Sequence, residues 1–260
     1  MERNAAMLEA VGLTKRYLRH AVVDAVNFRV APGEVLGYLG PNGSGKSTTV
    51  KMIVGLIEPS EGEALYRGRN IREDIKWFQS RLGYVPEEAH VYPYLTGREF
   101  LQLTGRLRGM EERALNEKID AMLNLFSLYE QRHGAIASYS KGMKQKILLT
   151  AALLHDPEVV IFDEPLSGLD VTTAMVFKSL VRALSGRGKV ILYSSHVLEV
   201  VEKVCTKVLI LRQGAVAAYD SVAELRRLMA SPSLEDVFAQ LAVQEDTEKV
   251  AAKLDAVIGG

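Results

Sequence analysis

The stretch VLGYLGPNGSGKSTTVKMIVGL, residues 35–56, decides the fold of this chain. It begins with a short apolar run, continues through a loop that holds three glycines, and ends in a run that suits a helix. The central nine residues fit the pattern G-x-x-x-x-G-K-[ST] of a phosphate-binding loop between a strand and a helix. The alternative is a glycine-rich hairpin with a chance lysine. The apolar run before the loop and the helical run after it favour the phosphate-binding loop.

Each residue type in this loop has a chemical reason. The three glycines let the backbone turn with its N–H groups facing inward, where they form a nest for an anion. The helix that follows is expected to begin at Lys46, so the positive end of its dipole points at the same place. Lys46 then reaches the β and γ phosphates of a nucleotide, and the Ser47 hydroxyl is a ligand for Mg²⁺. The predicted nucleotide-binding residues are Gly40, Pro41, Asn42, Gly43, Ser44, Gly45, Lys46, Ser47 and Thr48.

A second motif, VVIFDEP at residues 159–165, places two acids after four apolar residues. Such a pattern predicts a buried strand whose carboxylates emerge at its C-terminal end, where α/β sheets bind their ligands. Asp163 is then a candidate Mg²⁺ ligand, directly or through water, and Glu164 a candidate base that polarises an attacking water. Two solvated acids at a strand end are the alternative, which the phosphate-binding loop upstream disfavours. Together the two motifs predict a nucleoside triphosphatase.

The composition excludes several other classes of protein. The chain has 260 residues, of which 48% are hydrophobic and 25% charged, typical of a soluble globular protein. Lys+Arg and Asp+Glu both number 32, which argues against nucleic-acid binding through a general positive field. One cysteine, Cys205, excludes a disulfide framework within the chain and fits a reducing compartment. No apolar run approaches the roughly 18 residues of a membrane span, so we expect another chain to supply any membrane part.

The hydrophobic pattern predicts an α/β core with a helical insertion. From about residue 71 to 154 the sequence reads as helical, and we expect a helical insertion at about residues 88–150. Thr96 and Glu99 form a predicted capping box there. Beyond residue 157, short apolar strands alternate with helices, which indicates a mainly parallel sheet covered on both faces. Near the C-terminus, Ser233 and Asp236 predict a second capped helix, whose docking site the sequence leaves open.

Three further segments of the sequence carry residues that could act together with the two motifs. His196 in YSSHV ends another apolar strand at the edge where Asp163 and Glu164 emerge, so it could sense a γ-phosphate. The segment SGLD, residues 167–170, follows the acidic pair after a proline and a leucine. The polar segment SYSKGMKQK, residues 138–146, precedes a predicted helix and offers that helix end to an anion.

The order and spacing of these motifs closely resemble the nucleotide-binding subunits of ATP-binding cassette (ABC) transporters, over roughly residues 7–220. The resemblance implies a RecA-like P-loop core with an N-terminal antiparallel β subdomain and an inserted α-helical subdomain. Residues 1–220 would form the nucleotide-binding domain and 221–260 a C-terminal helical tail. In the family's terms, residues 40–48 match the Walker A loop and residues 159–164 the Walker B strand.

The resemblance also assigns roles to single residues. Tyr17 matches the aromatic residue that stacks on adenine, and His196 matches the switch histidine, which joins Glu164 and Lys46 as predicted catalytic residues. The D-loop is Ser167, Gly168, Leu169 and Asp170. The signature, which binds ATP held by another subunit, is Ser140, Lys141, Gly142 and Met143.

Two positions depart from the family's pattern. Glu87 stands at the Q-loop position, where glutamine is usual, so it can accept a hydrogen bond or bind a metal but cannot donate. That loop resembles the exporter-type branch of the family. In the signature, Lys141 replaces the first glycine and Met143 the glutamine.

The resemblance implies a mechanism in which two subunits pair head to tail around two ATP molecules with Mg²⁺. Hydrolysis opens the pair and drives export by a separate integral membrane permease, with this chain a peripheral protein at the cytoplasmic face of the cell membrane. A homodimer is expected, because one chain carries every motif, and no nucleic acid is expected as a partner. The alternatives are a soluble ABC ATPase acting on ribosomes or DNA and a regulatory nucleotide-binding protein with little hydrolysis. The single cassette disfavours the first, and Glu164 with His196 disfavours the second.

Overall fold

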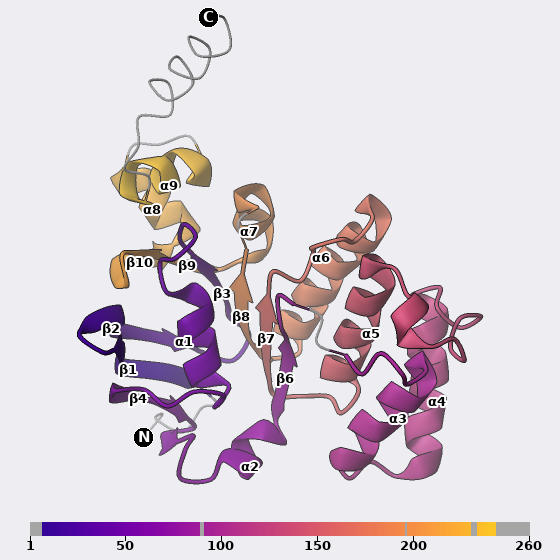
Figure 1. Ribbon diagram of the computed structural model, residues 1–260. Helices are drawn as coiled ribbons and strands as arrows, with labels where there is room; N and C mark the ends of the chain where they lie inside the picture. Colours follow the sequence, from indigo (N-terminus) through magenta and orange to yellow (C-terminus); the bar gives the residue numbers. More distant parts are fainter. Residues whose placement is uncertain (1–6, 89–90, 196, 230–232, 243–260) are drawn as a thin grey trace, which may run out of the picture.

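A six-stranded sheet forms the centre of the protein (Figure 1). The computed structural model describes residues 7–88, 91–195, 197–229 and 233–242. In spatial order the strands are β10 (Ala215–Ser221), β9 (Lys207–Arg212), β3 (Val35–Leu39), β8 (Val190–Ser194), β7 (Val159–Asp163) and β6 (Leu82–Val85). All neighbours are parallel except β10, which pairs with β9 as an antiparallel hairpin. Strands β3, β7 and β8 are buried along their whole length, which explains their almost unbroken apolar sequences.

The second sheet is antiparallel and lies against one face of the first. Its spatial order is β2 (His20–Val30), β1 (Leu8–Tyr17), β4 (Glu61–Tyr66) and β5 (Arg69–Asn70). Helix α1 (Lys46–Ile53) contacts β1, β2 and β7, and its residues Val50 and Met52 join one apolar cluster with both sheets. The predicted antiparallel β subdomain therefore shares its core with the P-loop strand and helix.

Helices cover the opposite face of the central sheet. Along β7 the side chains alternate: Val159 and Ile161 belong to the cluster with α1, whereas Val160 and Phe162 belong to the other. That second cluster includes side chains from α3, α4, α5, α6 and α7. The bounds of these helices are α3 (Gly97–Leu107), α4 (Glu112–Leu125), α5 (Lys141–Leu153), α6 (Val171–Gly186) and α7 (Leu198–Val204). The arrangement confirms the predicted α/β fold.

The helical insertion follows β6 and precedes β7. It contains α3, α4, the 3₁₀ turn η1 (Ile136–Ser138) and α5, which lie together to the right of the sheet in Figure 1. The predicted capping box is present: Thr96 Oγ1 accepts a hydrogen bond from Glu99 N, and the Glu99 carboxylate accepts one from Thr96 N. The division at residue 220 stays a prediction.

Strand β6 corrects the expectation that residues 71–154 are all helical. Only α2 (Ile75–Gln79) precedes β6 in that range, and β6 pairs with β7 from Leu82 opposite Val159. Its four residues are too few to show a periodicity of their own. A Cβ on Gly83 would lie 2.3 Å from the Ala152 carbonyl oxygen, so the glycine allows α5 to pack closely on the strand.

The described part of the C-terminal tail docks on the core. It forms α8 (Val222–Leu228) and α9 (Leu234–Ala242), and Leu234 and Val237 are fully buried. Helix α9 contacts β9, β10, α7 and α8. Asp236 N donates to Ser233 Oγ at 3.2 Å, which is the predicted cap of this helix. No helix in the described ranges is long and apolar enough to cross a membrane.

Candidate functional site

The glycine-rich loop joins β3 to α1 at the C-terminal edge of the central sheet. Gly45 caps α1 with a φ of 101°, a left-handed conformation that favours glycine. A Cβ on Gly45 would lie 2.5 Å from the Val22 carbonyl oxygen, and one on Gly40 would lie 2.3 Å from Ser44 Oγ. Glycines therefore let the loop curl tightly beneath the β2 backbone.

Lys46 lies inside this curl. Its Nζ donates to the carbonyl oxygens of Gly40 at 2.6 Å and Pro41 at 3.2 Å. Burial lowers the pKa of Lys46, while the carboxylates of Glu164, Asp163 and Glu87 act against that shift. The ammonium group is thus held by the loop and faces acidic groups from two other segments.

The end of β7 supplies two carboxylates, and the end of β8 supplies their hydrogen-bond partner. Asp163 ends β7, is nearly fully buried, and accepts a hydrogen bond from Ser194 Oγ of β8 at 2.8 Å. Burial raises the pKa of Asp163, and Glu87 adds to the rise, whereas the Ser194 hydrogen bond opposes it. Glu164 follows with a φ of 48°, and its backbone N–H donates to the Ser194 carbonyl oxygen at 3.1 Å.

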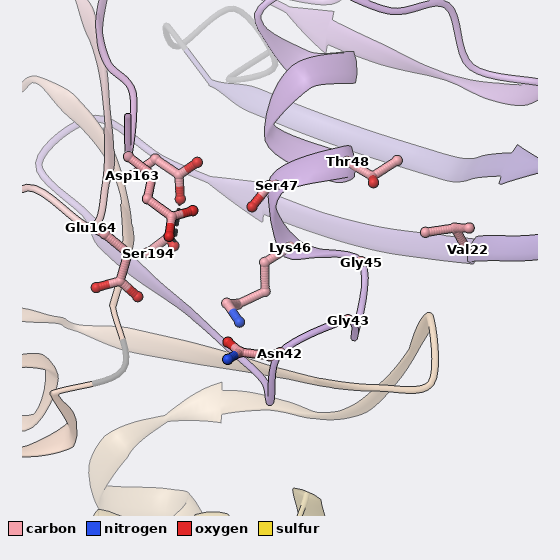
Figure 2. A pocket seen from close by; sticks show the side chains of 11 residues that line it. Val22, Asn42, Gly43, Gly45, Lys46, Ser47, Thr48, Asp163, Glu164 and Ser194 are labelled. Carbon is pink, nitrogen blue, oxygen red and sulfur yellow. Dashed lines mark hydrogen bonds between the residues drawn. The ribbon is translucent and has the colours of Figure 1, made fainter. Parts of the chain in front are cut away.

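These groups line one cavity of about 170 Å³ (Figure 2). The cavity brings together predicted residues from the glycine-rich loop, from the start of α1, from the end of β7 and from the Q-loop position. It also includes two residues that the sequence analysis did not predict, Val22 and Ser194. The lining residues are Val22, Asn42, Gly43, Gly45, Lys46, Ser47, Thr48, Glu87, Asp163, Glu164 and Ser194. The only signal for Ser194 in the sequence is its place at the end of the apolar run 190–194, which does not show that this strand lies beside β7.

The donor set suits a nucleotide phosphate and a hard cation. The Ser47 hydroxyl and the Asp163 carboxylate are oxygen ligands of the kind that Mg²⁺ binds, usually together with substrate phosphates. Within the described ranges, no group of three His, Cys, Asp or Glu side chains forms a metal cluster.

The predicted adenine-stacking residue lies outside the cavity. Tyr17 ends β1 and its side chain is half exposed. Lys15 Nζ lies 5.3 Å from the centre of its ring, within the range of a cation–π contact. The hairpin after Tyr17 reaches the loop, since His20, Ala21 and Val22 line a second hollow with Gly43 and Gln213.

The signature and the D-loop lie together but away from the cavity. Ser140 caps α5 by accepting a hydrogen bond from Met143 N at 3.2 Å. A Cβ on Gly142 would lie 2.7 Å from the Gly168 carbonyl oxygen, so the two segments are in close contact. Among the described residues that line the cavity, none comes from 140–143 or 167–170. The predicted switch histidine, His196, lies outside the described residues.

The D-loop ends by capping the next helix. Thr173 N and Thr173 Oγ1 donate to the Asp170 carboxylate at 2.8 and 2.7 Å, at the N-terminus of α6. The hydrogen bonds from Thr173 lower the pKa of Asp170 to about 2. Asp170 is therefore ionised at neutral pH.

Comparisons with known proteins identify the family. The ABC transporter family matches residues 23–167, more than half of the chain. The chain belongs to the ABC transporter family. It is 32% identical to the ABC-type transporter ATP-binding protein EcsA of Bacillus subtilis (strain 168), over 92% of this chain and 98% of EcsA. It is 33% identical to the ABC transporter ATP-binding protein NatA of the same organism, over 86% of this chain and 91% of NatA.

A solved structure agrees with the sequence comparisons. The chain matches an ATP-binding subunit of an ABC transporter with a TM-score of 0.86 and 32% identity, over 90% of this chain and 99% of that chain. The protein is therefore an ATP-binding and ATP-hydrolysing subunit of an ABC transporter, as the motifs predict. ABC ATP-binding proteins generally work with membrane permeases.

Proposed function

We propose that this ABC transporter subunit pairs head to tail with a second copy, and that closing and opening of the pair drives export by a separate permease. One observation carries the proposal. Lys46, Ser47, Asp163 and Glu164 face one cavity, yet the signature residues of the described chain lie outside it. The N-terminus of α5 suits a phosphate, but none of residues 140–143 lines this cavity, so we infer that the nucleotide it binds is held by another copy.

Within this proposal each residue has a separate task. Lys46 binds the β and γ phosphates, and Ser47 with Asp163 holds Mg²⁺, which supplies charge neutralisation at the phosphates when it is bound. Glu164 polarises the attacking water, and His196 keeps its predicted role as the switch histidine that senses the γ-phosphate. Ser140 and the N-terminal N–H groups of α5 bind the γ-phosphate held by the other copy. Tyr17 stacks on adenine.

The ATP site is linked to the permease through the helical insertion. Glu87 lines the cavity, and Tyr92 and Tyr94 follow it with 62% and 93% of their surface exposed. Exposed aromatic side chains are enriched at protein interfaces, so this segment suits contact with a membrane subunit. Export as the direction is supported by the resemblance of the Glu87 loop to the exporter-type branch. The location that follows is the cytoplasmic face of the cell membrane.

Purification from membranes tests the link to a permease. We expect the tagged protein to copurify with an integral membrane protein after detergent extraction. Tyr94→Asp should lower the recovered partner at least fivefold, because a charge would be buried in the contact. The control is Leu228→Asp, at an exposed position on α8 far from that segment in Figure 1. Copurification with ribosomes in place of a membrane protein would contradict the proposal.

A further inference from the structure

The side chain of Lys141, the residue that replaces a glycine of the family signature, lies against the D-loop. Lys141 is the first residue of α5 and is exposed. A Cβ on Gly168 would lie 2.9 Å from both Cγ and Cδ of Lys141, so the aliphatic stem of the lysine covers the Gly168 backbone. A glycine at position 141 would leave this contact unmade.

Helix α5 contacts the D-loop segment at two further points. The buried Gln145 donates from Nε2 to the Pro165 carbonyl oxygen at 3.0 Å. Lys146 Nζ lies 3.6 Å from Asp170 Oδ2. Lys141 and Gln145 are one helical turn apart and therefore lie on the same side of α5, and Lys146 follows Gln145 on the adjoining side. Of the three, only Lys141 contacts the middle of the loop.

The D-loop is joined by hydrogen-bonded turns to Glu164, the predicted catalytic base. Ser167 N donates to the Glu164 carbonyl oxygen at 3.2 Å, and Leu169 N donates to the Leu166 carbonyl oxygen at 3.1 Å. Glu164 is also tied to β8 through Ser194. Because two successive turns join Gly168 to Glu164, a shift of the loop is passed to the backbone of that residue.

We propose that Lys141 is a positioning residue, whose aliphatic stem holds residues 167–170 against α5 and thereby fixes Glu164 for hydrolysis. The stem performs this role, and the charge does not. Methylene groups over a glycine Cα exclude water and gain van der Waals contact, which needs no ammonium group. The inference rests on the proposed function for the role of Glu164. The contact between the Lys141 stem and residues 167–170 does not depend on that function.

Two variants of Lys141 separate the effect of its aliphatic stem from the effect of its charge. Lys141→Ala removes both while keeping a good helix former, and Lys141→Met restores most of the stem without the charge. Hydrogen–deuterium exchange of the peptide covering 165–170, without nucleotide, reports the loop directly. We expect about tenfold faster exchange in Lys141→Ala and recovery to near the parent rate in Lys141→Met.

Steady-state ATP hydrolysis tests the consequence at the site. In Lys141→Ala we expect kcat to fall about tenfold with little change in KM for ATP, since a displaced base slows the chemical step. Lys141→Met should recover most of the lost kcat. Equal melting temperatures of the three proteins would show that each is folded.

Three results would overturn the inference: unchanged exchange in Lys141→Ala, unchanged kcat in Lys141→Ala, or a Lys141→Met variant as impaired as Lys141→Ala. The last result would assign the effect to the charge. Failure of the proposed function gives a different pattern, because Glu164→Gln would then hydrolyse ATP at the parent rate while loop exchange still responded to Lys141.

Discussion

At the residue scale, the site depends on backbone conformations that few side chains tolerate. Gly45 takes a left-handed conformation beneath the Val22 carbonyl, and Glu164 takes one although it has a side chain. Such a conformation costs a non-glycine residue on the order of 1 kcal/mol, so the surrounding structure must hold it in place. The hydrogen bond from Glu164 N to the Ser194 carbonyl oxygen does so. The turn aims the carboxylate into the cavity that Lys46 shares.

A partly buried histidine makes stability depend on pH. His155 Nε2 lies 3.1 Å from the Leu82 carbonyl oxygen, its Nδ1 is buried, and burial lowers its pKa from 6.5 to about 4. The unfolded chain therefore takes up this proton first as pH falls. We expect the free energy of unfolding to decrease between pH 6.5 and pH 4, by on the order of 1–2 kcal/mol after allowance for partial exposure.

Urea unfolding across that pH range, compared with His155→Gln, isolates the contribution of His155. Glutamine keeps an N–H donor for Leu82 but does not titrate. The variant should lose less stability on acidification than the parent by the same 1–2 kcal/mol. Parallel pH profiles of the two proteins would contradict the assignment.

At the element scale, the P-loop strand and helix, the Walker B strand and the alternating helices could be predicted from the sequence. Each carries either a motif or a hydrophobic period long enough to recognise. Strand β6 could not, because four residues show no period and its place is set by pairing with β7. Ser194 could not be predicted for a related reason. Its role depends on which strand lies beside Asp163, and the pairing of β7 with β8 is a tertiary contact that the sequence does not show.

The N-terminus of α5 is the element whose role is tested most simply. Ser140→Arg places a bulky side chain where the phosphate of the other copy is expected to bind. We expect ATP binding by the single chain to be unchanged and the ATPase rate to fall by about 10²-fold, because the opposing half of the site is blocked.

Ser138→Arg, at an exposed position two residues earlier, is the matched control and should leave the rate near that of the parent. Equilibrium dialysis and a phosphate-release assay measure the two quantities. Loss of ATP binding by the single chain would show instead that the signature acts within its own subunit.

At the scale of the whole molecule, the phosphate-binding site and the predicted signature lie in different places of the chain. The first lies at the C-terminal edge of the central sheet, between β3, β7 and β8, where parallel sheets bind their ligands. The second lies at the start of α5 against the D-loop. Under the proposed function, a complete site forms between two copies, and ATP is the ligand that joins them.

The ATP-dependent association state of Glu164→Gln tests this claim most directly. Glutamine keeps the shape of the side chain but cannot act as a base, so hydrolysis should fall by about 10²–10⁴-fold while ATP still binds. Sedimentation velocity should show a dimer with ATP and Mg²⁺, and a monomer with ADP or after EDTA removes the metal. A Glu164→Gln protein that stays monomeric with ATP and Mg²⁺, or that hydrolyses ATP at the parent rate, would contradict the account.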